Sequence, residues 1–270
     1  MKGTVDAPAV DAHAHVFDLA TPLAPGAWHQ PPAEATIRQY LATLDAHGVQ
    51  RGVLAAASIY GTHNEHALEI CRRHAGRLRT TVILEPDCPM AAMKTMAASG
   101  AVGVRLQWRN VAETPDLGSP AWRTFLRRVA ELGWHVELHD DSARLPQPLA
   151  ALEAAGVTIV VDHFGRPAAE QGIRCPGFQR LLRSIETGRT WVKLSSAFRL
   201  ASPQLAADAA QALLRCAGPE RLMWGSDWPF AAFESRVDYG QTLADFADWV
   251  PDAAMRRHIG SETPQAFYFR

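Results

Sequence analysis

Two histidines near the start of the chain are spaced so that both side chains could serve one reactive site. They stand in the segment Asp11-Ala12-His13-Ala14-His15, inside a largely apolar stretch. Because alternate side chains of a β-strand point to the same face, His13 and His15 would project together. Two convergent imidazoles can polarise a carbonyl group or supply half of a metal site. This spacing alone is a weak signal, since histidine pairs also occur on solvated strands.

Three further titratable residues stand where short apolar runs end. His139 closes one such run, and His163 and Asp227 each follow another. If the runs are parallel strands, their carboxyl ends lie at the same end of the sheet. These side chains would then lie close to the two histidines there. A carboxylate can take a proton from water while imidazoles donate to an acyl oxygen. Such a set of residues could meet the two requirements of ester hydrolysis at neutral pH, an activated water and a polarised acyl oxygen.

Arginines form a second group at the same predicted strand ends. Arg105 lies in an apolar run with Arg109 just beyond it, and Arg166 and Arg199 follow two later runs. An arginine inside a protein is costly unless it meets an anion, and its planar fork suits carboxylates. The alternative is pairing with acidic residues of the protein itself. Several arginines at one mouth predict a substrate that bears one or more carboxylates.

The elements that must position these residues alternate between β-type runs and helical periodicity. Apolar residues of Ala33–Ala46 recur at helical spacing, as they do in Ala121–Leu132. Strands alternating with helices predict a parallel sheet, and eight strands can close into a barrel. No GxGxxG or P-loop motif favours an open doubly wound sheet. The eight runs are Pro8–Phe17, Gly52–Ser58, Arg79–Leu84, Gly103–Gln107, His135–His139, Thr158–Asp162, Trp191–Ser195 and Leu222–Ser226.

We therefore predict an α/β fold, a single (β/α)8 TIM barrel over residues 1–270, with the active site at the carboxyl ends of the strands. The 270 residues are 47% hydrophobic and 20% charged, as in folded globular proteins. A net charge of −1 argues against nucleic acid or an anionic membrane as partner.

Cellular location is predicted from the cysteines and from the apolar runs. The four cysteines are widely spaced and show no CxxC motif, which is typical of reduced thiols. The first residues lack a signal-peptide core, and no run reaches the ~18 apolar residues of a membrane span. We expect a cytoplasmic enzyme that acts on a small molecule.

The motifs together resemble the amidohydrolase superfamily, in its amidohydrolase-2 branch. The resemblance rests on His13-Ala-His15, on Asp-His-Phe-Gly-Arg-Pro at 162–167 and on Trp-Gly-Ser-Asp-Trp-Pro at 224–229. The segments Gly-Thr-His-Asn at 61–64 and Gly-Trp-His-Val at 133–136 are similar to those of the pyrone-dicarboxylate lactonases and related lactonases of that branch. The resemblance spans nearly the whole chain and implies an amidohydrolase-type barrel that opens a lactone.

Carried over by position, the resemblance implies roles for the residues singled out above. Asp227 would be the general base, and His13, His15 and His163 would polarise the lactone carbonyl. The expected substrate contacts come from the arginines and from the neighbourhood of the 61–64 motif. They are Arg105, Arg109, Arg166, Arg199, Ser58, Tyr60 and Asn64.

The metal is the point on which this chain departs from those lactonases. They work without one and carry tyrosine where this chain has His139, whereas metal-using members have a histidine there. His13, His15, His139 and Asp227 would then hold one divalent metal, for which zinc suits three nitrogen ligands and one oxygen. A metal-free mechanism is the alternative. The carboxylated lysine of binuclear members has no counterpart, because the only central lysine is Lys193.

Three functions are compatible with these residues. A lactonase of the carboxylic-ester hydrolase class, acting in aromatic catabolism on a pyrone dicarboxylate or muconolactone, is favoured by the motifs at 61–64 and 162–167. A metal-dependent decarboxylase of the same superfamily is the first alternative, which His139 favours. A barrel that binds carboxylates without catalysis is the second.

Overall fold

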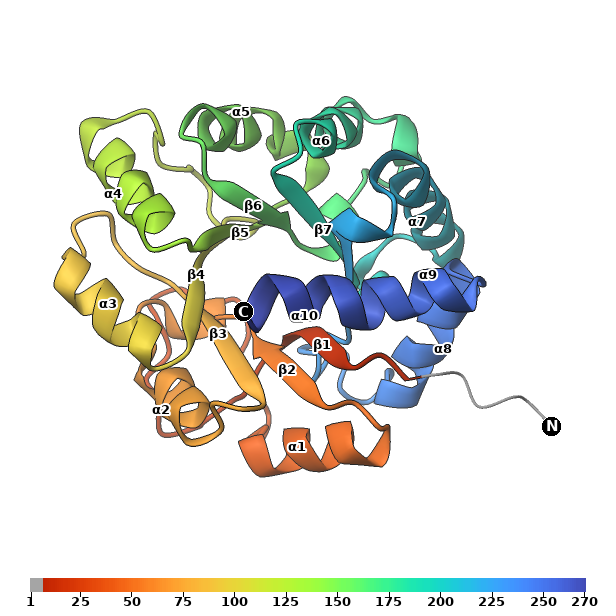
Figure 1. Ribbon diagram of the computed structural model, residues 1–270, viewed down its shortest axis with the longest axis horizontal. Coiled ribbons are helices and arrows are strands. Elements are labelled where there is room, and N and C mark those ends of the chain that lie inside the picture. Colours follow the sequence, from red (N-terminus) through yellow and green to blue (C-terminus); the bar gives the residue numbers. More distant parts are fainter. Residues whose placement is uncertain (1–6) are drawn as a thin grey trace.

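Eight parallel strands form one sheet whose order follows the chain from β1 to β8, with helices outside it (Figure 1). The computed structural model describes residues 7–270. Each strand pairs in parallel with the next one in the sequence. The strands are β1 (Val10–Ala14), β2 (Arg51–Leu54), β3 (Leu78–Val82), β4 (Ala101–Gln107), β5 (His135–His139), β6 (Thr158–Val161), β7 (Thr190–Ser195) and β8 (Leu222–Gly225).

The sheet closes just beyond β8, where the chain returns to β1. The amide of Asp227 donates to the carbonyl of His13 at 2.8 Å, and the amide of His15 donates to that of Trp228 at 2.7 Å. The closure therefore places the end of β8 directly against the two histidines. The predicted (β/α)8 TIM barrel is confirmed.

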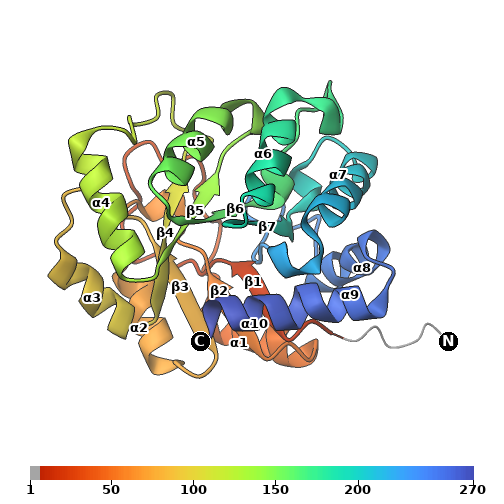
Figure 2. The ribbon, with the colours of Figure 1, turned by 45° about the horizontal axis from the view of Figure 1, so that its top comes forward.

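Helices α1 to α8 surround the barrel, and α9 and α10 cross one end of it (Figures 1 and 2). Short 3-10 turns follow β2 (Ser58–Tyr60), β5 (Ser142–Arg144), β6 (His163–Gly165) and β7 (Ala197–Arg199). The helices are α1 (Ile37–Ala46), α2 (Glu65–Arg73), α3 (Met90–Ala98), α4 (Pro120–Glu131), α5 (Pro146–Ala154), α6 (Pro176–Glu186), α7 (Pro203–Ala217), α8 (Tyr239–Trp249), α9 (Ala253–Arg257) and α10 (Thr263–Tyr268).

Local signals explain where the helices begin and end. Thr36 caps α1 through a capping box with Gln39, so the helix begins at Ile37 rather than at Ala33 as predicted. Ser202 caps α7 through the amide of Leu205. Gly218 follows α7 with a φ of 60°, a left-handed conformation that glycine adopts without steric cost.

The carboxyl-terminal helix closes the end of the barrel opposite to the predicted site. Tyr268 packs in a buried cluster with Val10, Val53, Val160 and Met223. These side chains are contributed by the strands β1, β2, β6 and β8. The far end of the barrel interior is thus filled with apolar groups, which leaves polar chemistry to the open end.

Several strands are shorter than predicted because the chain leaves the sheet to build loops. The run Pro8–Phe17 yields a strand only over Val10–Ala14, and Phe17 forms a bridge with Ala35 instead.

Among residues 7–270, no helix combines the length and the apolar character needed to cross a bilayer.

Candidate active site

Alternating side chains of the strands converge on a buried polar cluster at the open end of the barrel. His13 and His15 project from β1, and Asp227 approaches them from the segment after β8. The rings of His13 and His163 are 4.7 Å apart, as are those of His139 and His163. The structure therefore brings together the five titratable residues that the sequence singled out.

Asp227 lies at the centre of this cluster with its two oxygens in different surroundings. Oδ2 accepts from Ser196 Oγ at 2.5 Å and from Arg199 Nε at 2.7 Å. Oδ1 faces His15 Nε2 at 3.3 Å and His13 Nε2 at 3.6 Å. Burial raises the pKa of the Asp227 carboxyl, but Arg199 and His15 outweigh burial and hold the pKa well below its usual range. The carboxyl is therefore ionised at neutral pH.

His15 is oriented by a backbone carbonyl. His15 Nδ1 is 2.7 Å from the carbonyl oxygen of Ala55, which can only accept, so Nδ1 carries a hydrogen. This contact turns Nε2 toward the Asp227 carboxylate, 3.3 Å away.

Beneath the histidines, four charged side chains form a fully buried network. Lys193 Nζ contacts Glu137 Oε2 at 2.5 Å and Asp162 Oδ1 at 3.4 Å. Arg105 contacts the same two carboxylates, each at 2.9 Å. Burial raises the pKa of both carboxyls, but His13, Lys193 and Arg105 hold that of Asp162 well below its usual range, and Lys193 and His135 lower that of Glu137 to about 2. Both carboxyls are therefore ionised at neutral pH. Charges this deep are tolerated because each one is paired.

This network also contacts His13. Its Nδ1 lies 3.1 Å from Lys193 Nζ, which donates, and 3.2 Å from Asp162 Oδ1, which accepts. His13 Nε2 faces Asp227. Burial lowers the pKa of His13 to about 4, with Asp162 opposing the shift. His13 is therefore neutral near pH 7.

His139 and His163 complete the ring of imidazoles. His163 Nδ1 is 2.8 Å from Ser195 Oγ. His139 Nδ1 is 3.4 Å from the Arg105 guanidinium. Burial holds the pKa of each ring well below its usual value, and Arg105 adds to the shift at His139. Both rings are therefore neutral at physiological pH and can donate or accept hydrogen bonds.

Three of the four predicted arginines lie around the cavity in positions that a ligand can reach. Arg166 and Arg109 both donate to Asp141 Oδ1, at 2.8 Å and 3.2 Å. Arg199 is held by Asp227 and lies over the rings of Phe198 and Phe233. Arg105 also lines the cavity, but its side chain is 3% exposed and saturated by Glu137 and Asp162. The expectation that it binds substrate directly is therefore weakened by its pairing.

The site is built on backbone that bends sharply. His163, Phe164 and Arg166 all have positive φ, and so does Asp227. A left-handed conformation is uncommon for residues other than glycine and collects at functional sites. In the turn after β6, a Cβ on Gly165 would meet Leu181 Cδ2, so glycine is required there by space as well as by its φ of 69°.

The cavity above these groups measures about 210 Å³. Aromatic side chains that the sequence analysis did not single out form part of its wall. Trp28 donates from Nε1 to Ser58 Oγ at 3.1 Å and is 42% exposed, with Phe17 and Phe233 also on the wall. The long loop between β1 and α1 could have suggested a wall of this kind, but nothing in its sequence indicated which residue faces inward.

Two predicted substrate contacts lie outside this cavity, although Ser58 lines it. Tyr60 exchanges hydrogen bonds with Asp18, and Asn64 bonds to both the amide and the carbonyl of Ile83. Both side chains line a separate small pocket beside α2. Their hydrogen bonds hold the loops after β1, β2 and β3 together.

A metal was predicted on four ligands, and the structure gathers three of them. His13, His15 and Asp227 offer ligand atoms within 4.8 Å of one another, whereas His139 lies outside this group. A second group of His13, His163 and Asp162 uses a carboxylate already paired with Arg105 and Lys193. Two imidazoles and a carboxylate are sufficient donors for a catalytic divalent ion.

Comparison with known proteins gives a consistent result. The amidohydrolase family model matches residues 10–270. A 4-sulfomuconolactone hydrolase from Hydrogenophaga intermedia is 29% identical, over 96% of this chain and 88% of its own. A candidate 2-pyrone-4,6-dicarboxylic acid hydrolase from Pseudomonas putida is 40% identical with a TM-score of 0.90, covering 97% of this chain and 98% of its own. A probable enzyme of the same name from Acinetobacter baumannii, with citric acid bound, is 30% identical with a TM-score of 0.93, covering 97% and 100%.

Proposed function

The chain belongs to the amidohydrolase family, and from that premise we propose that it is a hydrolase that opens the ring of a small carboxylated lactone. The observation that carries the proposal is the position of Asp227, an ionised carboxylate on the floor of a cavity ringed by arginines. One of its oxygens is tied to Arg199 and Ser196, and the other faces two imidazoles. Relatives that act on sulfomuconolactone, or are named for pyrone dicarboxylate, support this substrate class.

The reaction follows from the position of Asp227 among the imidazoles. Water attacks the lactone carbonyl carbon while Asp227 Oδ1 takes one of its protons, and the carbonyl oxygen becomes an oxyanion. The neutral rings of His13 and His163 can donate to that oxygen as its charge grows. The ring C–O bond then breaks, and the leaving oxygen receives the proton from Asp227. The products are a carboxylate and a hydroxyl (or its enol form) in one open chain.

Arginines at the mouth orient the substrate for this step. Arg166 and Arg109 present charged forks on one side of the cavity, and Arg199 lies on another side beside Asp227. A bidentate contact to a substrate carboxylate would fix the ring over the base. The cavity of about 210 Å³ suits a single ring better than a polymer.

A divalent metal is the alternative to this metal-free scheme. His13, His15 and Asp227 could hold an ion such as zinc, which would polarise the carbonyl and acidify its bound water. One observation argues against it.

That observation is the charge balance of the site. Its floor holds three acids, Glu137, Asp162 and Asp227, against the three bases Arg105, Lys193 and Arg199. These charges already balance, so a divalent ion would add two uncompensated positive charges in a buried place. We therefore propose that ring opening proceeds without a metal.

Chelation tests this choice. Exhaustive treatment with a chelator should leave the rate of ring opening unchanged, and elemental analysis should find well below one metal per chain. Loss of activity that zinc restores, together with one equivalent of bound zinc, would overturn the metal-free proposal. The His139→Ala variant adds a second readout, since metal lost with His139 would place that residue in the ligand set.

Analysis of the products tests the reaction itself and separates it from decarboxylation. In water labelled with ¹⁸O, hydrolysis should place one labelled oxygen in the new carboxylate and release no CO₂. Release of one CO₂ per turnover with no label incorporated would support the decarboxylase instead. Binding of carboxylated lactones without any product would support a binding protein.

A further inference from the structure

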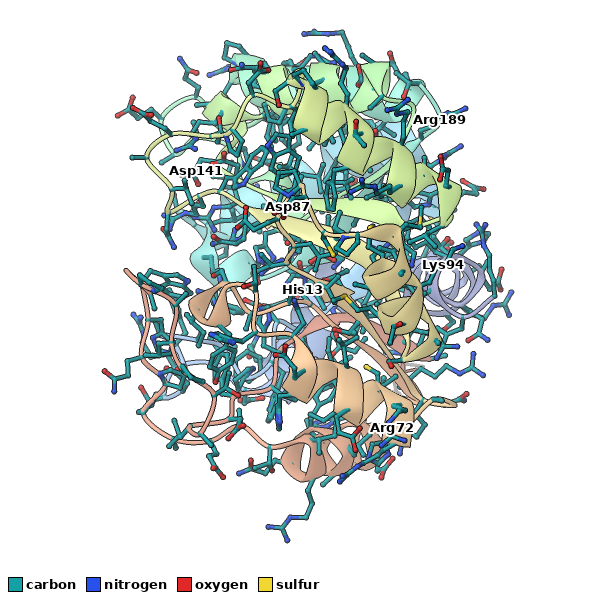
Figure 3. All side chains as sticks on the ribbon, turned by 90° about the vertical axis from the view of Figure 1, so that its left-hand side faces the viewer. His13, Arg72, Asp87, Lys94, Asp141 and Arg189 are labelled. Atoms are coloured by element: carbon teal, nitrogen blue, oxygen red, sulfur yellow. The ribbon has the colours of Figure 1, made fainter. Side chains whose placement is uncertain are left out.

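Asp141 holds two arginines of the cavity through a single oxygen. Its Oδ1 accepts from Arg166 Nε at 2.8 Å and from Arg109 Nε at 3.2 Å. The carboxylate makes no capping hydrogen bond to the 3-10 turn that it precedes. Its side chain is 47% exposed, and the two arginines that it holds line the cavity. In Figure 3, Asp141 is labelled toward the left-hand edge of the molecule and His13 near its centre.

The two arginines need more negative charge than this one carboxylate supplies. The Arg166 side chain is only 11% exposed. Burial lowers the pKa of Arg166, and Arg109 and Arg199 lower it further against the opposing effect of Asp141. Arg199 already contacts Asp227, so it does not share Asp141. Three arginines thus surround the cavity. Two of them share the Asp141 carboxylate, which is half exposed and can therefore be replaced by the carboxylate of a ligand.

The backbone around Asp141 allows its carboxylate to leave without disturbing Arg166. The amide of Ser142 donates to the carbonyl of Arg166 at 3.1 Å, which ties the turn after β5 to the turn after β6. This hydrogen bond involves no atom of the Asp141 side chain. A rotation of the Asp141 side chain into solvent would therefore free both guanidinium groups while Arg166 keeps its position.

We propose that Asp141 is an internal counter-ion that competes with the substrate carboxylate for Arg109 and Arg166, and that it thereby sets the affinity of the site for anions. The inference rests on the proposed function in that the substrate carries a carboxylate. Without substrate, Asp141 keeps the two cations in place. An incoming carboxylate binds both guanidinium groups and releases Asp141 to solvent. A weakly charged ligand does not displace Asp141 from the two arginines.

The direction in which Asp141→Asn changes the affinity for anions shows whether Asp141 competes with the ligand or positions the arginines for it. If Asp141 only positions the arginines, Asp141→Asn weakens anion binding. If Asp141 competes, the same change strengthens it, by roughly fivefold for a half-exposed ion pair. Asp141→Glu keeps the charge and should bind anions within about twofold of the unmodified protein.

Calorimetric titration with isophthalate is the test, because this planar dicarboxylate has no ester to hydrolyse. We expect the Asp141→Asn protein to bind isophthalate roughly fivefold more tightly. Glu113→Gln removes one charge from an exposed position without a charged partner among residues 7–270, and it should leave the affinity unchanged. Weaker or equal binding by Asp141→Asn, no binding by either protein, or an equal gain in Glu113→Gln overturns the proposal.

This outcome is separate from that of the proposed function. Isophthalate binding needs no turnover, so the competition can be established even if no lactone is opened. Conversely, a protein that opens carboxylated lactones but gains no affinity in Asp141→Asn keeps its function and loses only this role for Asp141.

Discussion

Lys193 balances the charge of buried carboxylates in the interior of the barrel. Its ammonium is fully buried and contacts Glu137, Asp162 and His13. Removing one partner of such a network leaves uncompensated charge in a place that water cannot reach. The same ammonium lies 3.1 Å from His13 Nδ1. One side chain thus links the charge balance of the barrel interior to an imidazole of the site.

Arg166 should contribute to substrate binding and much less to the chemical step. Arg166→Met should raise KM for a carboxylated lactone roughly ten- to hundredfold, because a bidentate charged contact contributes about 1.5–3 kcal/mol. Steady-state kinetics measure the effect. A neutral sugar lactone is the control, since its KM should hardly change. An unchanged KM for the charged substrate would remove Arg166 from the binding site.

At the scale of elements, the sequence was sufficient to predict the strands and the face on which the chemistry gathers. Period-two alternation gives β5 with the bounds His135–His139 that the structure shows. His163 and Asp227 lie together because parallel strands share an end, which is a property of the topology. His135 and Glu137 alternate with Val136 on this strand and are both buried, with His135 Nε2 4.0 Å from Glu137 Oε2.

Contacts between elements that are distant in the chain could not be predicted from the sequence. Lys193 shares its strand face with Ser195, two residues on, but nothing local identifies Glu137 and Asp162 as its partners. Tyr60 and Asn64 lie next to a family motif, yet their loop turns them toward Asp18 and Ile83. Loop conformation depends on packing against other loops, and such packing leaves no periodic signal.

The loop between β1 and α1 should select planar substrates through Trp28. Its exposed indole lines the cavity and is positioned by a hydrogen bond to Ser58. Trp28→Ala should raise KM for an unsaturated planar lactone by about fivefold, the range of one aromatic stacking contact. Trp28→Phe should restore most of the affinity. An equal loss for a saturated lactone of the same charge would contradict stacking.

At the scale of the whole molecule, burial of ionisable groups makes stability depend on pH. Burial lowers the pKa values of His13, His135, His139 and His163, so the folded protein keeps these rings neutral. The unfolded chain protonates them near pH 6.5. Between that pH and the folded pKa, the unfolded state binds more protons, so stability falls as pH falls.

The free energy of unfolding should therefore decrease steeply from pH 7 to pH 5. For His13, with a folded pKa of about 4, the full decrease on reaching that pH is about 3 kcal/mol. Urea unfolding at pH 7, 6 and 5 measures it. His13→Gln should flatten the dependence, and the control His74→Gln, on a partly exposed ring, should not. Equal stability at pH 7 and pH 5 would contradict neutral buried histidines.

The most direct test of the central claim is the rate of lactone opening by the Asp227→Asn protein. Absorbance of the unsaturated ring of a carboxylated lactone such as 2-pyrone-4,6-dicarboxylate follows the reaction, and circular dichroism and isophthalate binding verify that fold and site persist. Asparagine keeps the shape of the side chain but cannot accept the proton from water. We predict that kcat falls by about 10²–10⁴-fold. A rate within a few-fold of the unmodified protein on the same substrate would contradict the account.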